Sequence, residues 1–231
     1  MKQHVTKGIV LARTNYGEAD RIVTLLTPDQ GKLRLMAKGV RKPKSKLAGG
    51  IELFSVSDIT FIRGKKDIGT LVSSRLNTHY GNIVKDIDRT MLGYELIKQL
   101  NKATEDESEK DYFDLLEKTF ESLNSEHINK ELIELWFAAQ LLKLGGHTPN
   151  LQSDTTGDKL AADQTYNFSF DDMAFSPANG SGRFSVEGIK VLRLLFSNNS
   201  PQTLQQVQGM ENILMQLRPL MNTVQKTFTV V

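Results

Sequence analysis

The chain has 231 residues, of which 39 % are apolar and none is cysteine. This length and apolar content fit one large domain or two small ones with a buried core, so a collagen-like, disordered or disulfide-bonded chain is excluded. The lack of cysteine excludes a thiol nucleophile, an iron–sulfur cluster and a thiolate zinc site, and it fits a reducing compartment. The N-terminus lacks the apolar stretch of a signal peptide, and no run of about 18 apolar residues could span a bilayer. We therefore expect a cytoplasmic protein that does not enter membranes.

The formal net charge of +2 hides a strong asymmetry along the chain. Residues 1–80 contain 15 Lys and Arg against 6 Asp and Glu, whereas residues 81–231 contain 14 against 21. Such a division indicates that the first part meets a polyanion and the second does not. The change in charge coincides with a change in periodicity, so we expect two domains, residues 1–80 and 81–231.

The first 80 residues predict five β-strands. Aliphatic and alternating residues mark the strands, and turns rich in Gly and Pro separate them. The expected strands are Val5–Thr14, Ile22–Leu26, Leu33–Ala37, Ile51–Ile62 and Leu71–Leu76. Five strands without an intervening helix favour a small β-barrel, and the five-stranded OB-fold is the commonest nucleic-acid-binding barrel of this kind.

Helical periodicity begins at Asn82, so the whole chain is expected to be an α+β protein. The helices are expected over Asn82–Tyr94, Tyr112–Leu123, Ile128–Leu142, Val186–Phe196 and Met210–Val224. The first of them carries one apolar stripe, Ile83, Ile87, Met91 and Tyr94, which we expect to pack against the next two helices. Residues 150–183 are rich in Asn, Asp, Ser, Thr and Gly, and we expect a short irregular insertion there with one strand at Tyr166–Phe170.

The densest chemical signal is a cationic stretch. Seven of the 15 residues from Lys32 to Lys46 are basic and none is acidic. They are Lys32, Arg34, Lys38, Arg41, Lys42, Lys44 and Lys46. On a strand, the first three would point outward while Leu33, Leu35 and Ala37 face the core, and the rest would form a mobile basic loop. This pattern suits contacts with phosphates, whereas an ordinary solvated surface mixes both signs of charge.

A second basic cluster consists of Arg63, Lys65 and Lys66, which form either a nucleic-acid contact or an ordinary charged turn. Single-strand binders also stack bases on aromatic rings. The aromatic candidates in the first part of the chain are Tyr16, Phe54, Phe61 and Tyr80. Phe54 and Phe61 lie in apolar runs that predict core positions, so Tyr16, in a turn, is the first candidate for stacking.

Enzyme signatures are missing, and we predict no catalytic residue, metal or cofactor. Gln30-Gly31-Lys32 lacks the glycine spacing of a phosphate-binding loop, and the four histidines show no spacing typical of a metal site. One alternative is a magnesium-dependent nuclease that uses aspartates of the insertion. Its candidate ligands are Asp154, Asp158, Asp163, Asp171 and Asp172.

Residues 5–80 also resemble a known family. The matching segments are Gly8–Leu11, Tyr16–Pro28, Gly31–Leu35, Ala37–Ser45 and Ala48–Gly50, in this order. Together they resemble the N-terminal signature of the bacterial RecO family of DNA repair proteins. The helices up to about Pro149 fit that family's C-terminal domain by size and placement.

The resemblance implies an N-terminal OB-fold followed by a helical domain that acts as a non-enzymatic recombination mediator at the nucleoid. Such proteins bind single- and double-stranded DNA, anneal complementary strands and help RecA load. Their partners are RecR and the single-stranded-DNA-binding protein. The tail of the latter is an acidic peptide with an aromatic end, which suits an apolar groove flanked by a cation. Lys143, Lys190 and Arg193 are candidates for that cation.

The chain departs from the family at one place. Many members carry a zinc-binding cysteine pair after the segment that here reads Gly146-His-Thr-Pro149, and a second pair about twenty residues later. This chain has Asp154-Thr-Thr-Gly157 and Ser176-Pro-Ala-Asn179 there, which cannot bind zinc as thiolates. We expect a metal-free module in which Phe168, Phe170 and Phe175 pack on the helices. An RNA-binding OB protein of translation or ribosome assembly remains an alternative.

Overall fold

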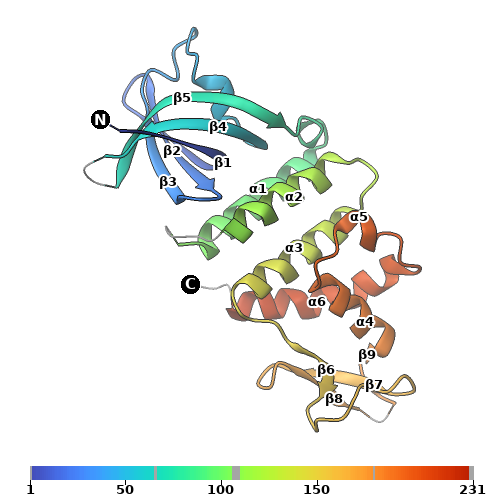
Figure 1. The fold of residues 1–231 in the computed structure, drawn as a ribbon. Coiled ribbons are helices and arrows are strands. Elements are labelled where there is room, and N and C mark those ends of the chain that lie inside the picture. The colour runs from blue at the N-terminus through green and yellow to red at the C-terminus, as the bar shows by residue number, and fades with distance from the viewer. Residues whose placement is uncertain (1, 65–66, 106–109, 179, 229–231) are drawn as a thin grey trace. The chain divides into compact units, whose positions relative to one another are not determined.

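The computed structural model describes residues 2–64, 67–105, 110–178 and 180–228. The chain divides into two compact units, residues 1–126 and residues 127–231 (Figure 1). The first two long helices therefore belong to the same unit as the barrel. The charge pattern predicts a different boundary, at residue 80, between a part that contacts a polyanion and a part that does not. That boundary stays a prediction.

The first unit contains a closed five-stranded barrel. Its strands are β1 (Gln3–Tyr16), β2 (Asp20–Thr27), β3 (Gly31–Ala37), β4 (Ser55–Ile62) and β5 (Ile68–His79). They close in the order β1-β2-β3-β5-β4, and only the β3–β5 pair is parallel. This is the architecture of an OB-fold, so the predicted barrel is confirmed.

The inward face of β3 shows why the sequence forms this barrel. Leu33, Leu35 and Ala37 are buried, while Lys32 and Arg34 point outward between them. The two-residue period of a strand thus places Leu33, Leu35 and Ala37 in the core, as predicted, and leaves Met36 half-buried on the outward face. The rest of the core comes from all the other strands, from the loop after β3 and from the short 3-10 helix η1 (Ala48–Ile51), with Val10, Val23, Leu25, Val40, Ile51, Ile59, Phe61 and Leu71.

The segment 51–54, expected to be strand, does not continue β4. Ile51 ends η1 and lies fully buried under the barrel. The close approach of η1 to β5 requires Gly50, because a Cβ atom there would lie 2.6 Å from Ser74. The chain therefore enters β4 only at Ser55.

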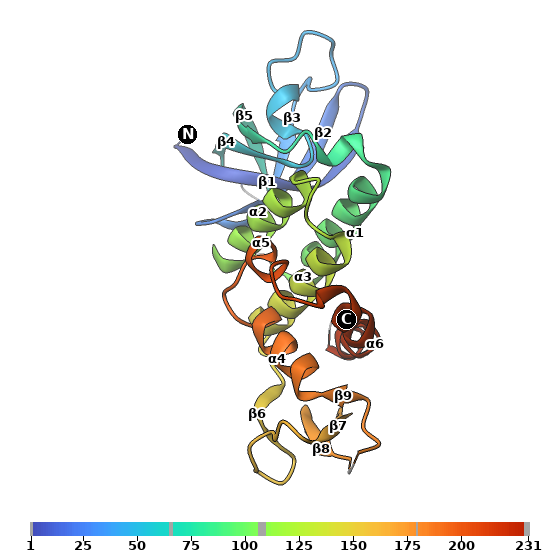
Figure 2. The same cartoon turned by 90° about the vertical axis from the view of Figure 1, so that its right-hand side faces the viewer.

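Two helices complete the first unit, α1 (Ile87–Ala103) and α2 (Lys110–Asn124), after the short 3-10 helix η2 (Ile83–Lys85). Both views show the two helices next to the barrel (Figures 1 and 2). The buried guanidinium of Arg89 donates hydrogen bonds to the carbonyl oxygens of Leu123 and Glu126, both at 3.0 Å. Arg89 thereby satisfies one carbonyl group in the last turn of α2, which has no helical partner, and a second one in the segment that follows.

The expected apolar stripe of the first helix is wrong at three of its four positions. Ile83 is buried, but Ile87, Met91 and Tyr94 are 73 %, 61 % and 46 % exposed. The buried face of α1 consists of Arg89, Gly93, Leu96, Ile97 and Leu100. A glycine and an arginine carry no hydrophobic signal in the sequence, so the periodicity pointed to the wrong face.

Gly93 lies at the joint between α1 and the barrel. The Phe54 side chain packs against it, and a Cβ atom at Gly93 would lie 2.5 Å from Phe54 Cε1. Phe54 adopts a positive φ of 55°, which is unfavourable for a bulky residue. Its ring contacts Tyr94 and Phe120 edge to face, with centroids 5.3 and 5.5 Å apart. The missing side chain of Gly93 thus makes room for a fully buried aromatic ring.

The second unit contains α3 (Lys130–Leu144), α4 (Val186–Leu195), the single turn α5 (Pro201–Leu204) and α6 (Met210–Phe228). These helices confirm the expected helical segments. α3 is buried along most of its length, and its Trp136 indole donates a hydrogen bond of 2.7 Å to the carbonyl oxygen of Asn199. The apolar α3 is therefore the core of this unit.

The insertion is more regular than the sequence predicts. It forms a four-stranded sheet in the order β6-β8-β7-β9. The strands are β6 (Asn150–Asp154), β7 (Thr165–Ser169), β8 (Ala174–Pro177) and β9 (Phe184–Ser185). Phe175 is fully buried, with ring centroids 5.2 Å from Phe168 and 5.5 Å from Phe184. The phenylalanines therefore pack on one another within the sheet, and Phe170 stays 41 % exposed.

A carboxylate closes the turn after β6. The side chain of Asp154 accepts hydrogen bonds from the backbone N–H and the hydroxyl of Thr156, at 2.8 and 2.6 Å, and from the N–H of Asp158 at 3.1 Å. The hydrogen bond from the Thr156 hydroxyl is the largest of the causes that lower the pKa of Asp154. Ionised Asp154 thus organises the turn that ends at Gly157.

We predict that Gly93→Ala lowers the free energy of unfolding by up to about 2 kcal/mol. The added methyl group favours the helix by about 1 kcal/mol, but it collides with Phe54, and overpacking of this kind costs about 1–3 kcal/mol. Urea unfolding followed by circular dichroism measures the difference. Gly49→Ala is the matched control, because a Cβ atom at Gly49 meets nothing within 4 Å. Equal stability of the two variants would contradict the proposed contact.

We also predict that Asp154→Ala lowers the midpoint of thermal unfolding at pH 7. Because the folded protein holds the pKa of Asp154 below its ordinary value of 3.8, the ionised group stabilises the fold at neutral pH. That contribution is lost as the pH falls through the lowered pKa, so the wild type and the variant converge in acid. Asp171→Ala, at an exposed position of the same module, is the control and is expected to unfold like the wild type at both pH values.

Candidate nucleic-acid interface

The cations of β3 do not all have the same surroundings. Arg34 is exposed, but Lys32 is half-buried. The Lys32 ammonium donates a hydrogen bond of 2.9 Å to the carbonyl oxygen of Asn101, in the last turn of α1. A cation at this position also interacts favourably with the helix dipole. Lys32 therefore joins the barrel to α1, a role that the sequence did not reveal because the two residues are 69 positions apart.

The other basic residues of this stretch gather in residues 38–46, called the basic loop below. Its backbone folds into successive turns, with Lys42 N–H donating to the Gly39 carbonyl (3.1 Å) and Ser45 N–H donating to the Lys42 carbonyl (3.0 Å). Gly39 supports the first turn with a φ of 65°. Two hydrogen-bonded turns thus shape the loop that the sequence predicts to be mobile.

The basic loop is hydrogen-bonded to the turn between β1 and β2. The backbone N–H of Arg41 donates to the Ala19 carbonyl at 2.9 Å, and its guanidinium donates to the Gly17 carbonyl at 3.2 Å. The N–H of Gly39 donates to the Asp20 carboxylate at 2.7 Å. These three contacts bring the basic loop beside the turn that connects the first two strands.

Four lysines of the basic loop have exposed side chains, and their ammonium groups form no hydrogen bond or ion pair within the part of the chain that the structure describes. They are Lys38, Lys42, Lys44 and Lys46. Unpaired ammonium groups on a fixed backbone are available to an external polyanion. The structure therefore gathers five of the ten predicted contact residues, including Arg41, in one loop.

A second group of cations lies at the opposite end of β3. Lys32, Arg34 and Arg63 line a cavity of about 340 Å³, together with Gln30 and Asp67. The Arg63 guanidinium donates a hydrogen bond to the Gln30 side chain. Along the chain, Lys32 and Arg34 precede Lys38 of the basic loop by six and four residues, which correspond to about 20 and 13 Å of extended strand. Lys65 and Lys66, the other members of the predicted second cluster, lie outside the described residues.

Of the four aromatic candidates, only Tyr16 is available at the surface. It is 56 % exposed, whereas Phe54 and Phe61 are each 1 % exposed and belong to the interior, as predicted. Tyr80 is 5 % exposed and packs on Phe120. Burial, and then the carboxylates of Glu117 and Glu121, raise the pKa of Tyr80 to about 12. Tyr80 is therefore part of the packing between the barrel and α2.

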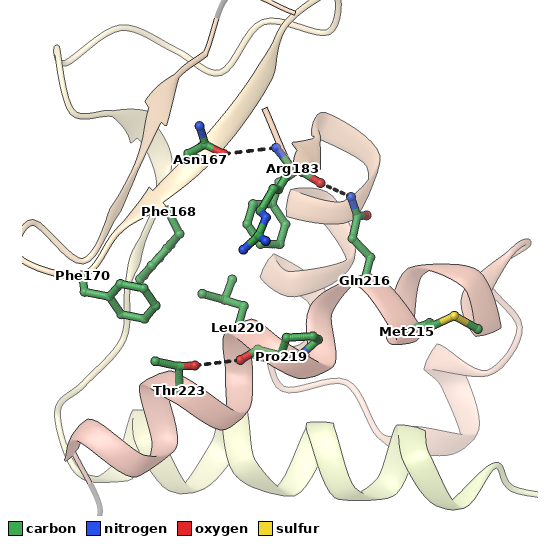
Figure 3. Close-up of a pocket in the computed structure, with 10 residues that line it drawn as sticks. Asn167, Phe168, Phe170, Arg183, Met215, Gln216, Pro219, Leu220 and Thr223 are labelled. Atoms are coloured by element: carbon green, nitrogen blue, oxygen red, sulfur yellow. Dashed lines mark hydrogen bonds between the residues drawn. The ribbon is translucent and has the colours of Figure 1, made fainter. Parts of the chain in front are cut away.

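The second unit contains an apolar pocket of about 710 Å³ that the sequence analysis missed (Figure 3). It lies between the small sheet and α6, and Figure 3 shows Phe168 and Phe170 on one side and Pro219 and Leu220 on the other. Arg183 is the one charged residue among those that line it, which also include Asn167, Phe184, Met215, Gln216 and Thr223. The side-chain amides of Asn167 and Gln216 bond only the backbone of Arg183, so its guanidinium remains at the pocket.

The three cations expected beside an apolar groove differ in their surroundings. Arg193 donates hydrogen bonds to the carbonyl oxygen of Leu151, and Lys143 donates one of 3.0 Å to Asn198. Lys190 is exposed on α4. None of the three lines the apolar pocket.

The aspartates of the insertion do not form a metal site in the described part of the chain. No group of three or more His, Cys, Asp or Glu side chains is placed there to hold a metal ion. The oxygen atoms of Asp154 bond the turn at Thr156, and Asp172 accepts a hydrogen bond from Ser169 at 2.7 Å. These residues fit neither the zinc site that the family resemblance would imply nor the magnesium cluster of a nuclease.

Among the residues that the structure describes, no helix is both long and apolar enough to cross a bilayer.

The fold and the surface together define a class. A closed OB-fold barrel with a basic loop is a scaffold of the kind that binds oligonucleotides or oligosaccharides. Comparison with protein families narrows this further: the model described as "Recombination protein O N terminal" matches residues 1–80, and "Recombination protein O C terminal" matches residues 84–223. The chain belongs to the recombination protein O (RecO) family.

Individual relatives agree with this assignment. A protein of Dehalococcoides mccartyi named DNA repair protein RecO is 33 % identical over 210 residues, which cover 85 % of this chain and 79 % of the relative. Proteins of the same name from Desulfatibacillum aliphaticivorans and Halalkalibacterium halodurans are 34 % and 31 % identical over 149 residues. Each of these two matches covers 58 % of the relative, and they cover 63 % and 64 % of this chain.

Proposed function

We propose that this protein is a non-enzymatic mediator of recombination that binds single- and double-stranded DNA, anneals complementary strands and helps RecA load onto DNA coated by single-stranded-DNA-binding protein. The family assignment supports a role in DNA repair. The observation that carries the finer proposal is the basic loop, with four unpaired lysines on a backbone tied to the barrel.

The proposed mechanism is electrostatic. Two complementary strands repel each other through their phosphates, and cations that contact both strands reduce this repulsion. No bond in the DNA is made or broken, so the mechanism needs no catalytic residue. Residues 1–80 would supply the DNA contacts in the cytoplasm, at the nucleoid. Residues 81–231 would serve contacts with proteins, among them RecR.

Salt dependence and annealing test this proposal. If four to six cations contact single-stranded phosphates, log K falls against log salt with a slope of roughly −3 to −4. We expect the combined variant Lys38→Glu, Arg41→Glu, Lys42→Glu and Lys44→Glu to lose most of its annealing of complementary oligonucleotides and most of its salt dependence.

The matched control changes the same charge elsewhere. Lys98, Lys118, Lys159 and Lys190 are exposed outside the barrel, and their combined replacement by Glu is expected to leave annealing within about threefold of wild type, because screening weakens distant charges. Equal losses in both variants, or a wild-type slope near zero, would contradict the role of the basic loop. Competition with a structured RNA distinguishes DNA binding from RNA binding.

We further propose that the acidic tail of the single-stranded-DNA-binding protein binds the apolar pocket of the second unit. An aromatic end fits walls made by Phe168, Phe170 and Leu220, and a carboxylate fits the guanidinium of Arg183. The volume of about 710 Å³ is that of a typical site for a small ligand or a short peptide end.

A synthetic peptide with the acidic, aromatic-ended tail tests the pocket. We expect Arg183→Glu to weaken peptide binding about tenfold, which corresponds to about 1.4 kcal/mol for a carboxylate that loses its cation and gains a like charge. Fluorescence anisotropy of a labelled peptide gives the affinity. Lys190→Glu makes the same change in charge outside the pocket, so a similar loss in that variant would show only general electrostatic attraction.

A further inference from the structure

The aromatic ring of Tyr16 does not pack in the core of the barrel. Within residues 2–64 and 67–80, it is the only Phe, Tyr or Trp side chain that is not buried. It is the last residue of β1 and lies opposite Asp20 of β2 in the register. A ring that is 56 % exposed adds little to the core, and aromatic surface left in water is available to a partner.

Tyr16 lies next to the contacts that hold the basic loop. The guanidinium of Arg41 bonds the carbonyl oxygen of Gly17, the residue that follows Tyr16. The carboxylate of Asp20, across the strand pair from Tyr16, accepts the N–H of Gly39. The two contacts come from different residues of the basic loop, so this loop is anchored on both sides of the turn that carries the ring.

An exposed ring next to the anchor of a loop rich in lysine matches the needs of a single strand. Ammonium groups attract the phosphates of any nucleic acid, whereas an aromatic face stacks on a base only when that base is unpaired. We propose that Tyr16 is a base-stacking site that makes the basic loop prefer single strands. This inference rests on the proposed DNA binding by the basic loop, and it adds the group that distinguishes a single strand from a duplex.

The proposal separates two contributions to binding. The lysines of the basic loop determine the dependence on salt for both forms of DNA, and Tyr16 contributes a term that salt hardly changes. An abasic strand keeps its phosphates but has nothing to stack. The wild type should therefore bind an abasic oligonucleotide about as well as a variant without the ring binds an ordinary one.

Replacement of the ring by a similar apolar group tests this. We expect Tyr16→Leu to bind a thymidine oligonucleotide about fivefold more weakly or worse, with an unchanged salt slope and unchanged affinity for a long duplex. Tyr16→Trp should bind the oligonucleotide at least as tightly as the wild type. Thermal unfolding checks that the variants fold, and Tyr94→Leu, at an exposed tyrosine of α1, is the matched control.

The outcomes separate this inference from the function on which it rests. If the wild type and Tyr16→Leu bind the thymidine oligonucleotide equally while the charge-reversed basic loop does not bind, stacking is refuted and DNA binding by the loop stands. If Tyr16→Leu loses affinity for duplex and single strand alike, the ring acts through the loop and the stacking site is refuted. If the wild type binds no DNA at low salt, the proposed function itself fails.

Discussion

The candidate interface depends on the hydrogen bonds that tie residues 38–46 to the turn between β1 and β2. A stretch with five cations repels itself and, without such contacts, would spread into solvent. The carbonyl oxygens of Gly17 and Ala19 and the carboxylate of Asp20 give it fixed partners. The lysine side chains are therefore presented from a defined backbone, which reduces the entropy lost when a ligand binds.

The barrel could be predicted from the sequence because the signals for its strands and turns lie within short segments of the chain. The alternation of Leu33, Leu35 and Ala37 with outward residues identifies β3 and its buried face, and the Gly- and Pro-rich turns separate the strands. The resemblance to the RecO family rests on the same 80 residues, and the family comparison confirms it. The outward direction of the cations thus follows from the two-residue period alone.

Long-range contacts could not be predicted in this way. Lys32, which the sequence predicts to contact DNA, donates a hydrogen bond to Asn101 and so has a structural role. No residue near Lys32 in the sequence indicates this hydrogen bond. The buried face of α1 is centred on Gly93 because Phe54 needs the space, although a hydrophobic pattern favours Met91 and Tyr94. The apolar pocket likewise combines segments that are distant in the chain, since Phe168 of β7 and Leu220 of α6 are 52 positions apart. Each of these features depends on shape complementarity between distant segments, which periodicity does not contain.

The turn closed by Asp154 has a consequence for the conditions in which the small sheet holds its shape. At the position where many family members place a cysteine pair, this chain uses a carboxylate that bonds its own backbone. Peroxides, disulfide exchange and chelating agents attack thiolate–metal clusters, but they have no reactive group to attack at Asp154, Thr156 or Asp158. The turn is therefore resistant to oxidants and chelating agents, and it loses the stabilising charge of Asp154 in strong acid.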